Sequence, residues 1–518
     1  MRNVVALSLS LACCSLPVDA GPAFLQIEAP DHQYTGGWEH YVGGGVAAFD
    51  CDGDHFTDLF VAGGESPAQL LRNKTPGRGA VIQYSSETPD ALALTHVTGA
   101  YPLDVDSDGF MDLVILRVGP NVLMKGGADC QFSPFPASLG FASADRWTTA
   151  FSATWEGTET LPTLAFGNYV DRKDPQGPFE ACDDNALYRP KGAAYQSPRM
   201  LSPGFCALSV LFSDWGRNGR ADLRISNDRH YYVRDGQEQM WAMEPIPRLF
   251  TKSDGWQQHR LWGMGIASRD ITGDGIPEVY LSSMGDQRLQ VLDTQSGGPS
   301  FSDAPFHLGT TAQRPHTGDD GRPSTGWHIA FGDVQNDGRD DVFIAKGNVE
   351  QMPSNALEDP NNLLIRQAGG QYLEGSVAAG VASTARSRGA ALSDLNLDGL
   401  LDLVVVNRRA PLEIYQNVSP DAGNWLALSL KQTAPNVNAV GAWVEVRSGA
   451  TLWAREVTTG GGHASGDMGL IHFGLGETQS VDLRVIWPDG TLSDWANLSP
   501  NRGILITRNG DKATLNSL

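Results

Sequence analysis

One short acidic pattern recurs along this chain, and it restricts the possible folds more than any other feature. Six segments align without gaps, with an aspartate at the first position, oxygen-bearing side chains at the third and fifth in most copies, and an acid at the ninth. Their first aspartates are Asp50, Asp104, Asp214, Asp270, Asp333 and Asp394, spaced by 54, 110, 56, 63 and 61 residues. The doubled second spacing predicts a degenerate copy midway, and the segment from Trp155 to Asn168 fills that place. The sequence therefore predicts seven repeats.

Each repeat is expected to contribute four short strands. Small and apolar residues precede the acidic turn, as in 44–49, and a second apolar run follows it, as in 59–62. Small residues before the turn suit an innermost strand, because large side chains would collide where the repeats converge on an axis. The chain has 59 Gly and 30 Pro, a composition that favours many turns over long helices. Four strands per repeat, arranged radially, protect the sheet edges by closing a ring. The predicted fold is an all-β, seven-bladed β-propeller followed by a small C-terminal β domain.

The acidic turns have the ligand pattern of a Ca²⁺ loop. Oxygens at positions 1, 3 and 5, a backbone carbonyl at 7 and a carboxylate at 9 can surround one hard cation, and glycine at 6 permits the sharp turn. An EF-hand needs Glu at position 12, where this chain has only Val, Ile or Leu, so that alternative is excluded. The predicted ligands are Asp50, Asp52, Asp54, Asp58, Asp104, Asp106, Asp108, Asp112, Asp270, Thr272, Asp274, Glu278, Asp333, Gln335, Asp337, Asp341, Asp394, Asn396, Asp398 and Asp402.

The loop that begins at Asp214 departs from this pattern. Gly216 offers no side-chain ligand at the third position, and Arg217 and Arg220 lie beside it. We expect this loop to bind metal weakly or not at all. The alternative for all the loops is that they are Asx-rich turns without metal.

The charge balance limits the partners. The chain has 38 basic and 60 acidic residues, a net charge of −22, which argues against nucleic acid and anionic membranes as partners. Five bound Ca²⁺ ions would reduce that charge to about −12.

The N-terminus is expected to be an export signal. Arg2 precedes the apolar run Val4–Leu16, and small residues allow cleavage after Ala20. A lipoprotein signal at Cys13 is the alternative. No later segment has 18 unbroken apolar residues, so no membrane span is expected, and the mature protein would be secreted or periplasmic.

Four cysteines remain after residue 20, enough for two disulfides in an exported chain. Cys182 and Cys206 bracket a loop-like stretch and are the favoured pair, which leaves Cys51 with Cys130. The alternative is that some are buried free thiols.

The last hundred residues lack acidic turns and carry a different series of motifs. In order, they are Asn424-Trp425-Leu426, Asn438 to Val444, Gly460-Gly461-Gly462-His463-Ala464-Ser465, His472 to Gly476 and Val485 to Gly490. The acidic loops of residues 44–418 resemble the FG-GAP repeats of integrin alpha-type propellers. The C-terminal series resembles the ASPIC/UnbV domain that follows such a propeller in the cartilage acidic protein family, except that His463 stands where that domain usually has an aromatic residue. The resemblance implies an exported calcium-binding propeller at 21–423, after a signal peptide at 1–20, and an ASPIC/UnbV-like domain at 424–518.

No hydrolase, zinc-protease, Cys-x-x-Cys or phosphate-loop motif is present, so no catalytic residue is predicted. The first hypothesis is a binding or adhesion module for a protein or glycan. The alternative is a secreted enzyme, for example one acting on polysaccharide, with its site at the axial mouth of the propeller.

Overall fold

The computed structural model describes residues 21–228, 235–311, 321–510 and 512–518, so the predicted signal peptide lies outside it. Strands account for 45% of the structure and helices for 4%, which confirms the all-β prediction. The helices are α1 (Ser376–Ala379) and five 3-10 turns, η1 (Trp38–His40), η2 (Ala128–Cys130), η3 (Ala137–Leu139), η4 (Lys252–Asp254) and η5 (Phe306–Leu308). No helix in the described ranges is long and apolar enough to cross a membrane.

The residues before 420 form consecutive antiparallel sets of strands. The first two sets are β2 (Val46–Phe49), β3 (Asp58–Val61), β4 (Gln69–Asn73) and β5 (Tyr84–Ser86), and β6 (Val97–Leu103), β7 (Asp112–Gly119), β8 (Val122–Gly127) and β9 (Gln131–Pro134). The next two are β10 (Arg146–Thr154), β11 (Thr163–Asn168), β12 (Asn185–Tyr188) and β15 (Arg199–Leu201), with the hairpin β13 (Pro190–Lys191) and β14 (Ala194–Tyr195), and β16 (Ala207–Ser213), β17 (Asp222–Asn227), β18 (Gln239–Ala242) and β19 (Arg248–Leu249). The remaining sets are β20 (Gly263–Arg269), β21 (Glu278–Ser283), β22 (Arg288–Leu292) and β23 (Phe301–Asp303); β24 (Gly326–Gly332), β25 (Asp341–Lys346), β26 (Asn362–Arg366) and β27 (Tyr372–Glu374); and β28 (Arg386–Ser393), β29 (Asp402–Arg408) and β30 (Glu413–Asn417). A short β7–β10 pairing joins the second and third sets into one sheet.

The first strands of these sets converge. β2, β6, β10, β16, β20, β24 and β28 contact one another in this order, and β28 contacts β2, so the sets close into a ring. β2 shows why the strands can approach closely: its four residues are fully buried, and two of them are alanines. The prediction that small residues mark the innermost strand fits these contacts.

The ring is closed by a strand from the beginning of the chain. β1 (Phe24–Ile27) pairs antiparallel with β30 and completes the last set, with Phe24 opposite Asn417 and Ile27 opposite Ile414. Two disulfides, Cys51–Cys130 and Cys182–Cys206, each join one set to the next, as predicted.

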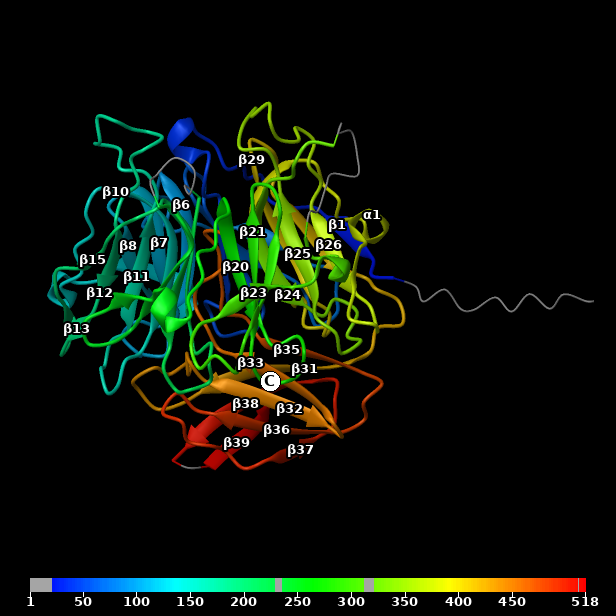
Figure 1. The fold of residues 1–518 in the computed structure, drawn as a ribbon. Coiled ribbons are helices and arrows are strands. Elements are labelled where there is room, and N and C mark those ends of the chain that lie inside the picture. Colours follow the sequence, from blue (N-terminus) through cyan, green and yellow to red (C-terminus); the bar gives the residue numbers. More distant parts are fainter. Residues whose placement is uncertain (1–20, 229–234, 312–320, 511) are drawn as a thin grey trace, which may run out of the picture.

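The C-terminal residues form two four-stranded sheets against one end of the ring (Figure 1). The first sheet has the order β35 (Ile471–Gly476), β31 (Asn424–Lys431), β38 (Arg502–Asn509), β39 (Lys512–Ser517). The second has the order β33 (Thr451–Glu456), β32 (Trp443–Ser448), β36 (Val481–Ile486), β37 (Ala496–Leu498). A separate hydrophobic cluster that includes Leu428, Val444 and Trp487 lies between these strands.

A glycine-rich segment of this domain enters the ring along its axis. We call residues 459–469 the finger; its short strand β34 (Gly466–Asp467) pairs parallel with β2. Gly461 N donates to Val210 O at 2.8 Å, and Gly462 N donates to Ile266 O at 2.7 Å. Isolated bridges link the finger to β6, β10, β16 and β20. The finger therefore runs along the innermost strands and fills this part of the axis.

Candidate metal sites at the acidic loops

The acidic loops join the first and second strands of their sets and share one hydrogen-bond scheme. In the second loop, the carboxylate of Asp104 accepts from the backbone N–H of Asp108 at 3.1 Å and of Gly109 at 2.9 Å. Asp112, the last acid, accepts from Val105 N at 2.7 Å and from Gly126 N, on the third strand, at 2.8 Å. The loop is thus shaped by its own first and last carboxylates.

The same two roles recur around the ring. The first acids that accept from loop N–H groups are Asp50, Asp270, Asp333 and Asp394, and the last acids that do so are Asp58, Glu278, Asp341 and Asp402. The sixth position has a positive φ, between +85° and +94° in Gly109, Gly275, Gly338 and Gly399. His55 adopts φ 74° at this position, so it takes the glycine conformation despite its side chain.

The loops differ in how closely their carboxylates gather. Oxygens of Asp104, Asp106 and Asp108 lie within 4.8 Å of one another, as do those of Asp50, Asp52 and Asp58. Within the described residues, the acids of the loops that begin at Asp270, Asp333 and Asp394 do not form a group this close. Two of the five predicted sites therefore bring together three acidic ligands.

The second loop fits a hard cation best. Asp106 Oδ1 is buried and has no hydrogen-bond partner, a costly arrangement for a carboxylate oxygen unless a cation or water meets it. The carbonyl oxygens at the seventh position, in Phe56, Phe110, Ile276, Arg339 and Leu400, accept no hydrogen bond from the described residues. These oxygens are the donor type and the positions that Ca²⁺ requires.

Burial makes the loop carboxylates hard to ionise without a counter-charge. It raises the pKa of Asp104 to about 6, of Asp112 to about 8 and of Glu278 to about 7. Burial likewise raises the pKa of Asp58 to about 7, of Asp394 to about 7 and of Asp333 to about 8. A bound divalent cation would offset this cost.

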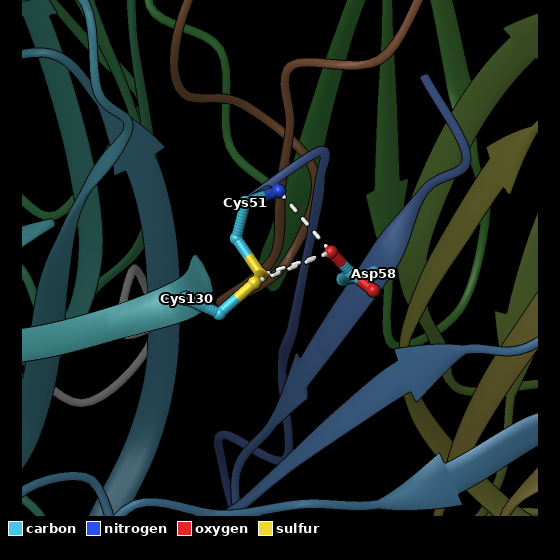
Figure 2. A group of neighbouring side chains, drawn as sticks. All are labelled: Cys51, Asp58 and Cys130. Carbon is cyan, nitrogen blue, oxygen red and sulfur yellow. Dashed lines mark hydrogen bonds between the residues drawn. A yellow bond between two sulfur atoms is a disulfide. The ribbon is translucent and has the colours of Figure 1, made fainter. Parts of the chain in front are cut away.

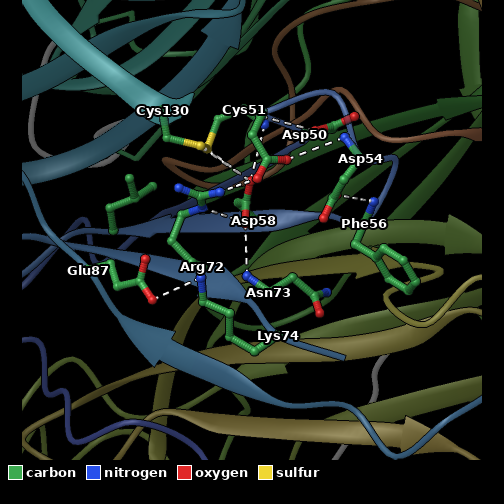
Figure 3. A network of polar contacts seen from close by, with 12 residues as sticks. Asp50, Cys51, Asp54, Phe56, Asp58, Arg72, Asn73, Lys74, Glu87 and Cys130 are labelled. Carbon is green, nitrogen blue, oxygen red and sulfur yellow. Dashed lines mark hydrogen bonds and ion pairs between the residues drawn. A yellow bond between two sulfur atoms is a disulfide. The ribbon is translucent and has the colours of Figure 1, made fainter. Parts of the chain in front are cut away.

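Basic side chains supply part of the counter-charge. Lys125 Nζ, on the third strand, donates to Asp106 and lies 2.6 Å from Asp108 Oδ2. In the first loop, Arg72 pairs with Asp52. Arg72 Nε also lies 3.5 Å from Asp58 Oδ1 (Figure 3). Each of these basic side chains contacts later acids of its loop, while the first acid accepts from backbone N–H groups.

A disulfide lies beside the first loop. Asp58 Oδ2 is 2.9 Å from Cys51 Sγ and 3.8 Å from Cys130 Sγ (Figure 2). Because both sulfurs are in the disulfide, neither has a proton to donate nor a thiolate to bind metal. This trio is therefore structural, and only the carboxylate remains as a ligand.

In the loop that begins at Asp214, protein groups contact the last acid and the loop backbone. Arg220 Nε donates to Asp222 Oδ1 at 3.2 Å, and Trp215 Nε1 donates to Asp222 Oδ2 at 3.0 Å. Glu456 of the C-terminal domain accepts from Asp214 N at 2.7 Å. The roles of Trp215 and Glu456 were missed by sequence reasoning, since neither belongs to the ligand pattern.

The degenerate copy forms a set of strands as well. Its loop links β10 to β11, and Arg189 Nη2 donates to Glu156 Oε1 at 2.8 Å, so an ion pair stands where the other loops place acids.

Trp147, Leu208, Met264 and Trp327, each the second residue of an innermost strand, pack in one buried cluster. A cavity of about 290 Å³ lies between the finger, the innermost strands β20, β24 and β28, and the C-terminal sheets, and Arg455, Asp467 and His472 line part of it.

Two family models match parts of the chain: FG-GAP-like repeat at residues 50–115, and ASPIC and UnbV at residues 432–513. Together with the repeated loops, they define an FG-GAP repeat protein with a C-terminal ASPIC and UnbV domain.

Within that class, the chain is related to cartilage acidic protein 1. It is 28% identical to the Mus musculus protein over 483 residues, covering 86% of this chain and 71% of the relative. It is 27% identical to the Homo sapiens protein over 484 residues, covering 86% and 69%. The family resemblance predicted from the motifs is confirmed.

Solved structures give weaker likenesses. BBS1N, in a complex with ARL6DN, aligns with a TM-score of 0.44 and 9% identity over 76% of this chain and 96% of that one. An Agrocybe aegerita protein described as recognising non-reducing terminal N-acetylglucosamine aligns with a TM-score of 0.37 and 13% identity over 64% and 79%. Neither score is high enough to inform the interpretation of this chain.

Proposed function

We propose that the ring of sheets is a seven-bladed propeller whose five complete acidic loops bind Ca²⁺, and that the protein is an exported binding module for a protein or glycan. The observation that carries the calcium proposal is the second loop, where oxygens of Asp104, Asp106 and Asp108 lie within 4.8 Å of one another and Asp106 Oδ1 is buried without a hydrogen-bond partner. The recurrence of the same loop frame at the other four positions extends the proposal to them.

Export is supported by the two disulfides, which persist in oxidising compartments. The signal peptide at 1–20 and cleavage after Ala20 remain part of the proposal. The domain limits 21–423 and 424–518 do as well.

A binding role fits this molecule better than a catalytic one. On the side of the C-terminal domain the finger runs along the innermost strands, which reduces the space for the alternative, an active site at the axial mouth. No contact among the described residues favours a second candidate function.

Calcium stoichiometry tests the proposal directly. Native mass spectrometry of the mature chain, freed of metal and then titrated with Ca²⁺, should show about five bound ions with affinities of extracellular type, Kd about 10⁻⁴–10⁻³ M. Absence of binding at millimolar Ca²⁺ would leave the loops as metal-free turns. Glycan and protein arrays probed with the loaded chain and with the chelated chain would then identify the partner.

A further inference from the structure

We propose that calcium in the acidic loops controls how firmly the C-terminal domain, with its finger, is held on the ring. The inference rests on the proposed calcium function and adds a regulatory step to it. It is carried by contacts between the C-terminal domain and the backbone of the predicted calcium loops.

The C-terminal domain binds the loops through their main-chain carbonyls. Trp453 Nε1 donates to Gly338 O at 2.9 Å, and Gly476 N donates to Asn336 O at 2.7 Å. His472 Nε2 lies 3.0 Å from Gly399 O. These acceptors are at the fourth and sixth loop positions, so the seventh carbonyl stays free for a cation. The same turns can therefore hold metal and domain together.

The C-terminal domain and the loops are closely packed at these contacts. A Cβ added to Gly474 would overlap the carboxylate of Asp333, the first acid of its loop. A Cβ added to Gly399 would overlap the indole of Trp425. A change in loop shape on losing the cation would therefore be transmitted to the domain, because closely packed groups cannot absorb it.

The finger is joined directly along the chain to the strands that make these contacts. It lies between β33, which carries Trp453, and β35, which carries His472 and Gly474. The strands on both sides of the finger are thus the strands that sit on the loops. Loosening β33 and β35 would release the finger from both ends.

One anchor should not depend on calcium. At the Asp214 loop, Glu456 accepts from Ser213 Oγ at 2.6 Å, and Arg217 Nη2 donates to Glu445 Oε1 at 2.7 Å. Because these ion pairs and hydrogen bonds need no metal, chelation should loosen the domain without detaching it.

Hydrogen exchange on the full mature chain tests the coupling. The readout is the exchange of finger amides that donate into the ring, those of Gly461, Gly462 and Met468. We expect their exchange to be about tenfold faster or more in chelator than in 1 mM Ca²⁺, within the usual range of coupling between sites. Exchange in β18 serves as the internal reference, because its side chains pack in clusters that contain no residue of the C-terminal domain.

A pair of variants separates the contact from the metal. Trp453→Phe removes the donation to Gly338 and should speed finger exchange in saturating Ca²⁺. Trp495→Phe is the matched control, because that ring stacks on Arg447 and Arg484 within the C-terminal domain. It should leave finger exchange unchanged.

Calcium counts on the same samples distinguish the outcomes. If calcium binds and chelator speeds exchange in the finger but not in β18, the coupling is supported. Bound calcium with finger exchange unchanged overturns the coupling and leaves the calcium function standing. Equal acceleration in the finger and β18 shows global destabilisation and also overturns it. If no calcium binds, both proposals fail together.

Discussion

At the scale of single residues, the second and third loops differ in the groups that contact their last acid. Among the described residues, Asp112 accepts from two backbone N–H groups, and its pKa is raised to about 8 by burial. Asp222 has the guanidinium of Arg220 and the indole N–H of Trp215 as well as a backbone donor. A charge that the protein has already neutralised leaves little for a cation to stabilise.

The two loops should therefore respond differently to substitution. Asp108→Ala removes a ligand from the fullest site and should lower the calcium count by one ion. Asp214→Ala should leave the count unchanged, although it removes two loop hydrogen bonds and costs about 1–3 kcal/mol of stability. Native mass spectrometry in millimolar Ca²⁺ gives both counts. Equal losses would show that the arginine and tryptophan do not replace the metal.

At the scale of elements, the finger is shaped by glycines on both sides of its contact with the ring. Gly45 and Gly99 lie on or before innermost strands, and a Cβ on either would overlap Ala464 O. Ala464 O in turn accepts from Ala100 N at 3.2 Å. The missing side chains are what lets a backbone segment run along the inside of the ring.

A single methyl group should disturb this fit. Gly99→Ala forces Ala464 away and should destabilise the protein by about 1–3 kcal/mol, the usual cost of overpacking. Gly77→Ala is the control, because a Cβ there would meet nothing within 4 Å. Denaturant unfolding in saturating calcium compares the two, and equal stabilities would refute the tight fit.

The finger also contains a histidine that must stay neutral. His463 Nε2 accepts from Gly43 N at 3.1 Å, and Nδ1 lies 3.4 Å from Met264 O, which fixes the tautomer with hydrogen on Nδ1. Burial, and then Arg388 and His328, lower the pKa of His463 from 6.5 to about 3. A base with a lowered folded-state pKa stabilises the fold fully above pH 6.5 and loses this contribution as pH falls toward 3.

His463→Asn should accordingly flatten the pH dependence. Between pH 6.5 and 5, the protein should lose about 2 kcal/mol more of its unfolding free energy than the variant does. The difference between the two profiles isolates the histidine, because the loop carboxylates and His328 are common to both. Parallel profiles would contradict the assigned buried, neutral state.

The sequence predicted the repeats, the all-β class and both disulfides because each leaves a local signature: acids at fixed spacing, short apolar runs and an even number of cysteines. It also placed small residues correctly in the innermost strands. The finger could not be foreseen, because nothing local in Gly460-Gly461-Gly462-His463 says that it lies among strands up to 420 residues earlier. The pairing of β1 with β30 could not be foreseen either, because the two strands lie at the beginning and the end of the segment that forms the ring. The loop frame was expected, but the contacts of Lys125, Arg72 and Glu456 depend on tertiary structure.

At the scale of the whole molecule, the carboxylates of the acidic turns repel one another, and bound calcium would reduce this repulsion. The net charge is −22, and the loops place several buried carboxylates at the end of the ring that the C-terminal domain covers. Each site of extracellular affinity should add about 0.4–1.4 kcal/mol at millimolar Ca²⁺, so five sites would stabilise the fold by about 2–7 kcal/mol.

Thermal unfolding of the mature chain with and without calcium tests this account most directly. The melting temperature in millimolar Ca²⁺ should exceed that in chelator by several degrees, and the difference should grow with calcium concentration as binding to the folded state requires. Mg²⁺ at the same concentration should reproduce little of the shift, because it demands a tighter octahedral site. Coincident melting curves in calcium and in chelator would contradict the account.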